Sequence, residues 1–411
     1  MARRLIASVV FSVLLFLCHR ADADDIRIGM SAAFSGPSRG LGIELYRGSM
    51  AYFESINNSG GIAGNRLRLI AYDDRYDPVS AIENTIRLAE QDRVLLLIDY
   101  VGTPTVTRIL PLLKRYSGSH LYLFFPFTGA QFQREPPYDQ YVFNLRASYR
   151  EETAALVDRF VEAGRKKVAI FYQIDSYGRS GWEGVKRALS KYGLKIASEA
   201  TYRRGAGFDV SMKRQVQILK AANPDVIISV GAYAACAAFI RDARDAGWNV
   251  PIANISFVGS ENLVQLLLQQ GATAKKDYTR NLINSQVVPS YEDVSLPAVR
   301  EYRSLMSRNH PALPASLVPG DYMAVPYSFA GFEGYLNARL LVEVLRKIGD
   351  KIDASRIRQT VEALGSVDLG IGSPAIFNPQ RHQALDSIYY TTVENGRVVP
   401  LRDWSRWRIK R

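Results

Sequence analysis

Residues 26–56 of this 411-residue chain read IRIGMSAAFSGPSRGLGIELYRGSMAYFESI. A short apolar run is followed by a turn that contains glycine, and the turn by a segment with helical periodicity. The apolar residues of that segment fall three or four positions apart and predict one buried helix face: Ile43, Tyr46, Met50, Phe53 and Ile56. The stretch therefore predicts a strand, a turn and a helix in succession.

The same alternation continues along the chain. Further apolar runs, rich in β-branched and aromatic residues, predict strands at 66–72, 94–100, 121–127, 168–174, 225–231, 251–259 and 282–288. Segments with helical spacing lie between them; in one, Pro78 suits a first helical turn, and Ile82, Ile86 and Ala89 predict its buried face. Continuous apolar strands that alternate with helices are typical of parallel sheets covered on both faces.

The alternation occurs once before about residue 146 and again between about residues 150 and 276. It predicts an α/β protein of two doubly wound parallel-sheet lobes. The apolar run at 282–288 needs a sheet to join, and the long helical stretch at 322–348 needs a sheet to pack against. Both predict that the chain returns to the first lobe. We therefore expect lobe 1 to comprise residues 24–146 and 277–383, lobe 2 to comprise residues 147–276 and 384–411, and three segments to form the hinge between them.

The first 23 residues have the pattern of a secretory signal. A basic start precedes an apolar run over residues 5–17 and an Ala-x-Ala end, so we expect cleavage after Ala23 and a periplasmic location. A membrane anchor is the alternative, but the run is shorter than the roughly 20 apolar residues that a spanning helix needs. Lipidation of Cys18 is disfavoured because Leu17 is bulky where a small residue is needed.

Composition excludes several function classes. The net charge is +12, but the lysines and arginines are scattered singly, so a nucleic-acid partner is not expected. Beyond the signal, Cys236 stands alone, so no intrachain disulfide can form. Its surroundings, AYAACAAFI, predict a small core residue.

No catalytic constellation is visible in the sequence. His120, His310 and His382 stand apart from one another and from any metal-binding spacing. The glycines at positions 36, 40 and 42 do not form G-x-G-x-x-G, and there is no Walker loop. These observations predict a binding protein rather than an enzyme, without cofactor or metal.

One acidic group could suggest a metal site. Asp73, Asp74 and Asp77 lie within five residues of one another. Pro78 follows directly, however, and favours a turn that starts a helix over a metal cluster.

In open α/β sheets, ligands bind beyond the carboxyl ends of the strands. The predicted strands are followed by Ser35-Gly36-Pro37, Gly102-Thr103-Pro104-Thr105, Phe127-Thr128-Gly129-Ala130, Tyr177-Gly178, Gly231-Ala232-Tyr233 and Gly259-Ser260-Glu261. Helix N-termini and threonine hydroxyls suit a carboxylate, and an acid flanked by aromatic rings suits an ammonium. Together these groups would recognise an α-amino acid.

Each of these residues also has a purely structural interpretation. Thr103 and Thr128 could only cap helices. Tyr177 and Tyr233 could be rim aromatics with their hydroxyls in water. Glu261 could be a first-turn acid that the helix dipole favours.

Five segments resemble the solute-binding proteins of ABC importers of the leucine/isoleucine/valine-binding type. They are IGMSAAFSGP, NNSGGIAGNRLRLIAYDDRYDP, DSYGRSGW, GAYAACAAFIRDARDAG and FVGSEN, which together run through most of the chain. The resemblance implies the type I periplasmic binding protein fold. It also implies that the first lobe binds the ligand's carboxylate through Gly102, Thr103, Thr128 and Gly129, while Tyr177 and Tyr233 contact the ligand and Glu261 takes its ammonium.

The sequence departs from the family in the side chains around the expected ligand. Leu41 replaces a frequent aromatic residue, Phe127 is bulkier than usual, and Tyr100-Val101-Gly102-Thr103 replaces a serine-rich turn. The resemblance implies a monomeric receptor that delivers a branched-chain or other amino acid to a membrane permease. A sensory binding protein, a binder of a small carboxylate or aromatic acid, and an exported hydrolase remain alternatives.

Overall fold

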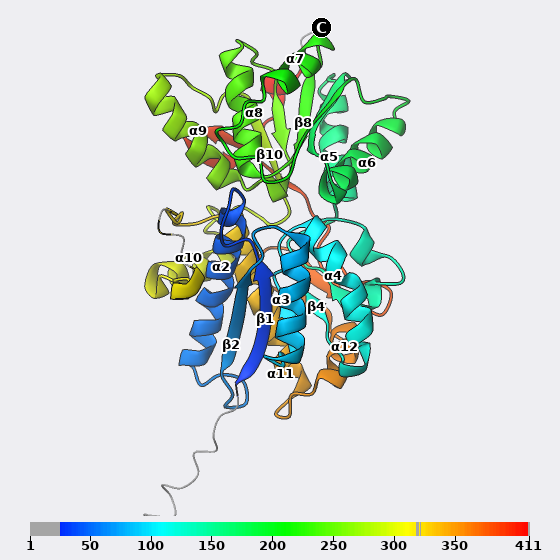
Figure 1. Ribbon diagram of the computed structural model, residues 1–411, viewed down its shortest axis with the longest axis vertical. Coiled ribbons are helices and arrows are strands. Elements are labelled where there is room, and N and C mark those ends of the chain that lie inside the picture. Colours follow the sequence, from blue (N-terminus) through cyan, green and yellow to red (C-terminus); the bar gives the residue numbers. More distant parts are fainter. Residues whose placement is uncertain (1–24, 318–319, 321, 410–411) are drawn as a thin grey trace, which may run out of the picture.

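The computed structural model describes residues 25–317, 320 and 322–409, so the expected signal sequence lies outside the described residues. The described chain forms two α/β lobes stacked along the long axis of the molecule (Figure 1). None of the described helices combines the length and apolar character needed to cross a membrane.

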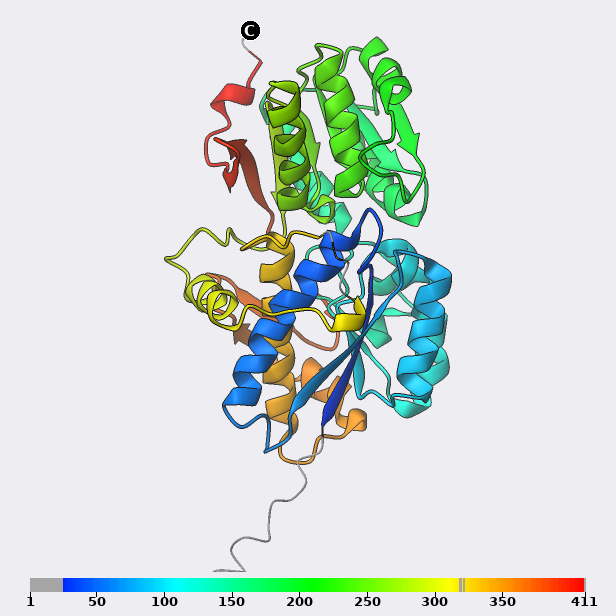
Figure 2. The ribbon, with the colours of Figure 1, turned by 60° about the vertical axis from the view of Figure 1, so that its left-hand side comes forward.

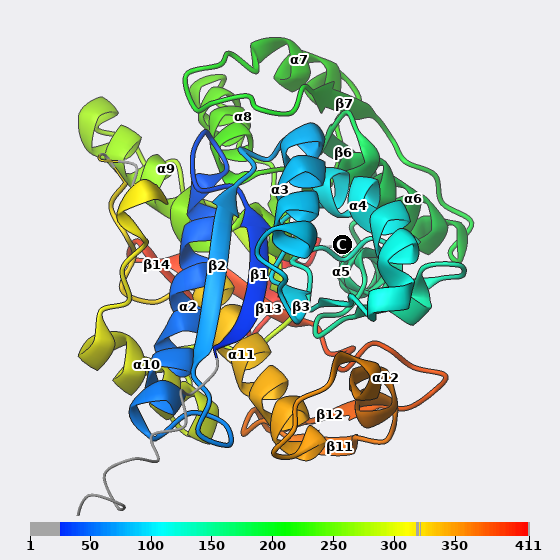
Figure 3. The ribbon, with the colours of Figure 1, turned by 60° about the horizontal axis from the view of Figure 1, so that its bottom comes forward.

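The first lobe is built around a five-stranded parallel sheet. Its strands, in spatial order, are β2 (Leu67–Asp73), β1 (Ile26–Ala32), β3 (Leu96–Ile98), β4 (Leu123–Phe124) and β5 (Val142–Phe143). Its helices are α2 (Arg39–Asn58), α3 (Pro78–Glu90), α4 (Thr103–Arg115), α10 (Pro297–Asn309), α11 (Phe329–Ile348) and α12 (Ala354–Glu362). A small hairpin of β11 (Gly365–Asp368) and β12 (Pro374–Phe377) lies beside α12 (Figure 3).

The second lobe contains a seven-stranded sheet. Its strands, in spatial order, are β14 (Arg397–Pro400), β13 (Tyr389–Glu394), β10 (Leu282–Gln286), β9 (Ile252–Asn254), β8 (Val226–Val230), β6 (Val168–Gln173) and β7 (Glu199–Tyr202). Its helices are α5 (Tyr149–Glu162), α6 (Ser176–Ser190), α7 (Lys213–Ala221), α8 (Tyr233–Asp245) and α9 (Ser260–Ala274).

Three segments connect the lobes. They lie between β5 and α5, after β10, and between β12 and β13. Figure 2 shows β13 and β14, in red, beside the second lobe, although the chain before them belongs to the first. The prediction of two α/β lobes with a three-segment hinge is confirmed.

Two details of that prediction are wrong. The boundary at residue 277 lies too early, because β10 pairs with β9 and β13 and so belongs to the second lobe. The second sheet is also not entirely parallel, since β13 runs antiparallel to both β10 and β14. Pairing partners are chosen by tertiary packing, which an isolated apolar run does not encode.

The predicted helix faces are confirmed in α2 and displaced in α3. In α2 the expected face is buried, with Met50 partly exposed. In α3 the buried residues are Ala81, Thr85 and Leu88, each one position before the expected set. Both sets have helical spacing, so periodicity alone does not decide which of the two faces is buried.

Helices α2 and α11 approach each other closely because glycines line their contact. A Cβ added to Gly48 would lie 1.8 Å from the carbonyl oxygen of Gly331. A larger residue at position 48 would therefore push the helices apart. Since α2 begins directly after the loop that follows β1, this contact fixes where the loop meets the second lobe.

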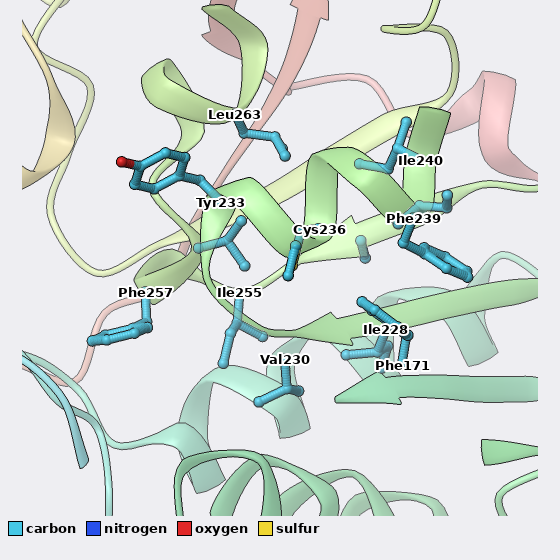
Figure 4. Close-up of a cluster of buried hydrophobic side chains, with 14 of the residues drawn as sticks. Phe171, Ile228, Val230, Tyr233, Cys236, Phe239, Ile240, Ile255, Phe257 and Leu263 are labelled. Carbon is cyan, nitrogen blue, oxygen red and sulfur yellow. The ribbon is translucent and has the colours of Figure 1, made fainter. Parts of the chain in front are cut away.

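The core of the second lobe lies between its sheet and α8 (Figure 4). Phe171 of β6 stacks on Phe239 of α8, with ring centroids 4.2 Å apart. Cys236 is a free, fully buried thiol 3.2 Å from the Ser229 hydroxyl, which confirms the prediction of a core residue.

Candidate functional site

The carboxyl ends of the first lobe's strands bring Gly102, Thr103 and Thr128 together. Gly102 precedes α4 with a φ of 100°, and a Cβ on it would lie 2.0 Å from a ring carbon of Tyr76. Only glycine tolerates both that conformation and that contact. Glycine is needed at position 102 because the Tyr76 ring packs directly against the turn that precedes α4.

Thr103 and Thr128 are fully buried, and their hydroxyl oxygens lie 2.7 Å apart. One hydroxyl donates to the other, so the pair keeps one proton for another acceptor. Thr103 makes no side-chain cap on α4, whose N-cap is Gly102. Thr128 accepts a hydrogen bond from the backbone of Ala130 at 3.2 Å. Helix capping therefore does not explain the pair.

Gly129 makes room for Tyr149, the first residue of α5. The Tyr149 amide donates to the Gly129 carbonyl at 2.6 Å, and a Cβ on Gly129 would lie 2.6 Å from the tyrosine ring. Gly129 thus positions a side chain of the second lobe against the first.

Tyr149 was not predicted as a site residue. It is fully buried, and its ring centroid lies 5.3 Å from that of Tyr177. Burial raises the pKa of Tyr149, while the Arg146 guanidinium and the hydroxyls of Thr128 and Thr103 oppose that rise. The Thr128 and Thr103 hydroxyls and the Gly129 backbone therefore lie close to the Tyr149 hydroxyl, but none of them meets it in full hydrogen-bond geometry.

Tyr177 is brought to this cluster by the N-terminus of α6, which Asp175 caps. Its ring lies 4.6 Å from that of Phe257, and its hydroxyl donates to the Gly231 carbonyl at 3.1 Å. Because Tyr177 is fully buried, the interpretation as a rim aromatic in water is wrong for this residue.

Tyr233 lies in a second contact between the lobes. Its hydroxyl accepts a hydrogen bond from the Gly40 amide at 3.2 Å, and Leu41 packs nearby against Gly259. In Figure 4 its hydroxyl points away from Cys236 and the lobe core. Tyr233 therefore ties the first turn of α2 to the second lobe.

Glu261 is not brought to Thr103, Thr128 and Tyr177. The strand expected at 251–259 ends at Asn254, and a 3₁₀ turn at Ser256–Val258 precedes α9. Glu261 lies in the first turn of α9, where it accepts from the Phe329 amide at 3.3 Å. It lines a pocket of about 440 Å³ with Tyr291. Ser256 and Phe257 occupy the place beyond β9 instead.

An arginine from the first hinge segment completes the site. Arg146 is buried, and its guanidinium lies 4.3 Å from the centroid of the Phe127 ring. Its Nε lies 3.3 Å from a carboxylate oxygen of Glu333 in α11. Its Nη2 donates to the Ser256 hydroxyl of the second lobe. Arg146 therefore contacts both lobes.

Two buried carboxylates flank Arg146. Glu152 accepts from the Ser256 amide at 2.6 Å and from the Ser285 hydroxyl at 2.7 Å. Burial raises the pKa of Glu333 to about 7, although the Arg146 charge lowers it. Both acids are already engaged by the protein.

The three aspartates near residue 75 support the turn rather than a metal site. Asp77 caps α3 by accepting from the amides of Val79 and Ser80, which confirms the predicted helix start. Asp74 accepts from the Ser31 hydroxyl at 2.9 Å. Within residues 25–317 and 322–409, no three potential metal ligands gather in one place.

Sequence reasoning missed Arg146 and Tyr149 because the strand before them was not recognised. β5 has two residues, too few to show a pattern. The run YVFNLRASYR would have been the only signal of another strand end.

Comparison with known proteins shows the family. A sequence profile described as periplasmic binding protein matches residues 25–397. A Leu/Ile/Val-binding protein homolog 7 of Brucella melitensis is 25% identical over 386 residues, which cover 90% of this chain and 88% of the relative.

Solved structures agree. A possible leucine/isoleucine/valine-binding protein of Rhodopirellula baltica is 33% identical, with a TM-score of 0.82 over 93% of this chain and 98% of its own. A branched-chain amino acid transporter protein of Thermus thermophilus, solved with bound valine, is 16% identical with a TM-score of 0.79 over 92% and 96%, and shows the fold alone. The chain thus belongs to the periplasmic binding protein family, with the type I fold.

Proposed function

We propose that this protein is the periplasmic solute receptor of an ABC importer. It binds a small carboxylate-bearing solute, such as a branched-chain or other amino acid, between its lobes and delivers it to a membrane permease. It acts as a monomer, without catalysis, after cleavage of its signal behind Ala23.

One observation carries this proposal. Hydroxyl groups of Thr103 and Thr128 from the first lobe lie close to Tyr149 from the second, whose ring packs beside Tyr177, at the strand ends where open α/β sheets bind ligands. A hinge of three segments allows the lobes to part and to close on a solute. The names of the relatives support an amino acid as one solute class.

Binding is tested on protein that has been unfolded, stripped of ligand and refolded. We expect an affinity in the micromolar range or tighter, about −8 kcal/mol, for at least one solute in a panel of amino acids and small carboxylates. At a hundred times the dissociation constant, that solute should add about 2.7 kcal/mol of stability. Absence of any thermal shift or calorimetric signal across the panel would contradict a receptor for this class.

Delivery to a permease is tested in cells. Deleting the gene should abolish high-affinity uptake of the radiolabelled solute, and a plasmid copy should restore it. Unchanged uptake together with a lost transcriptional response to the solute would instead identify a sensory binding protein.

A further inference from the structure

The site contains donors that the protein does not use. Arg146 Nη1 and the Tyr149 hydroxyl are buried without a hydrogen-bond partner. Arg146 is 1% exposed and Tyr149 is 0% exposed. Buried polar groups in folded proteins almost always have partners, so orphaned groups at one place need an explanation.

These donors lie around one position. The Arg146 guanidinium lies 4.3 Å from the Phe127 ring centroid, and Thr128, whose hydroxyl is 2.7 Å from that of Thr103, is the next residue along the chain. A Cβ on the following Gly129 would lie 2.6 Å from the Tyr149 ring, so these four polar groups come from directly adjoining residues. The hydrogen bond between the two threonine hydroxyls uses one of their two protons, so the second proton can be donated to another acceptor. An acceptor at this position would therefore receive hydrogen bonds from a guanidinium, a phenol and an aliphatic hydroxyl.

Aromatic rings close the position on its sides. Phe127, Tyr177 and Phe257 form a chain of ring contacts, with centroids 5.6 Å apart for Phe127 and Phe257 and 4.6 Å for Tyr177 and Phe257. Rings exclude water, so charged hydrogen bonds among them are stronger than in solvent. The acceptor that best matches a planar guanidinium fork is a carboxylate.

None of the three acids described above is free to pair with an ammonium at this position. Glu152 is held by Ser256 and Ser285. Glu333 faces Arg146, and Glu261 faces Phe329. An ammonium placed here would meet the Arg146 charge and three hydrogen-bond donors.

We infer that Arg146 and Tyr149 bind the carboxylate of the solute, and that recognition requires no α-ammonium. The inference rests on the proposed receptor function and narrows its solute class to carboxylates with an apolar or aromatic remainder. Deaminated acids then bind at least as tightly as the corresponding amino acids.

The test compares four pairs of affinities by calorimetry on stripped, refolded protein. The probes are leucine, 4-methylpentanoate, phenylalanine and 3-phenylpropionate, with the primary amides of the two acids as neutral analogues. We expect the acids to match or exceed the amino acids and the amides to bind at least about a hundred-fold more weakly, as loss of a charged hydrogen-bond set implies.

The decisive variant is Tyr149→Phe. It removes a hydroxyl without a protein partner, so the ligand-free protein should keep or gain stability while affinity for the acids falls roughly ten-fold or more. Tyr302→Phe is the matched control: Tyr302 is equally buried in the first lobe but bonds to Ser328. It should lower stability and leave affinity unchanged.

A double variant tests Arg146 without leaving Glu333 as an unpaired buried charge. Arg146→Gln combined with Glu333→Gln removes both charges of the pair and should abolish discrimination between acid and amide. Tyr149→Phe with full affinity for every acid, or wild-type protein that prefers the amides or requires the ammonium, would overturn the inference while leaving the receptor function intact. Wild-type protein that binds no solute of any charge would instead refute the receptor function itself.

Discussion

Replacing Glu261 by Gln separates two roles for this acid. If Glu261 takes the ligand's ammonium, amino-acid affinity should fall by roughly 2–5 kcal/mol on loss of the charge. If it acts where the structure places it, beside Tyr291 and Phe329, affinity should not change. Stability should then respond instead, in a direction that pH determines.

The magnitude follows from burial. Burial raises the pKa of Glu261 to about 7 from an ordinary value of 4.5, against hydrogen bonds from Tyr291 and Phe329 that lower it. When the pKa of a carboxyl group is higher in the folded state than in the unfolded state, its contribution to stability is fully present at pH values below the unfolded-state pKa. That contribution is lost as the pH rises through the folded-state pKa. At about 1.4 kcal/mol per pH unit, the loss at pH 8 has a ceiling of roughly 3 kcal/mol.

The Glu261 side chain lines a pocket and is partly exposed, so solvent reduces this figure. We expect the Gln variant to be about 1–2 kcal/mol more stable than wild type at pH 8, with the difference vanishing near pH 4.5. Urea unfolding at both pH values measures it, and calorimetry with leucine measures affinity. A large loss of leucine affinity with no pH-dependent gain in stability would refute the structural placement.

Three further predictions concern other buried groups. Burial raises the pKa of Asp99 to about 8, so wild type should lose stability as pH rises from about 4 to 8; Asp99→Asn should abolish that loss in pH-dependent urea titrations. Gly102→Ala forces a φ of 100° on a residue with a Cβ and a clash with Tyr76, which should cost about 1–3 kcal/mol of unfolding free energy. Tyr233→Phe deletes the acceptor of the Gly40 amide between the lobes; calorimetry should find ligand affinity weaker by about 0.5–1.5 kcal/mol, whereas unchanged affinity would exclude this contact from closure.

The residues of the first lobe's candidate site were predictable because two signals coincide. Thr103 and Thr128 each follow an apolar run that forms a buried parallel strand, and a glycine lies beside each. A buried strand leaves little choice of register, so the residues just beyond it lie at the sheet's carboxyl edge. The 2.7 Å contact between the hydroxyls is the geometric result of that rule.

The same rule misplaced Glu261 because an apolar run need not be all strand. Residues 251–259 read as one run, but pairing with β8 and β10 covers only Ile252–Asn254. The remaining residues turn as a 3₁₀ helix and bury Phe257 against Tyr177. Where a strand stops depends on its neighbours, and these were 25 or more residues away in sequence.

In the inferred binding mode, the position of Arg146 joins ligand recognition to closure. It belongs to a hinge segment, contacts Phe127 and Glu333 in the first lobe, and donates to Ser256 in the second. A ligand shifts the balance between open and closed lobes only by its different affinity for the two states. A carboxylate bound at Arg146 and Tyr149 interacts with residues that come together when the lobes meet. In the binding mode that we infer, the charge of the solute would act on closure directly, while the rings of Phe127, Tyr177 and Phe257 would select the remainder of the molecule by its shape.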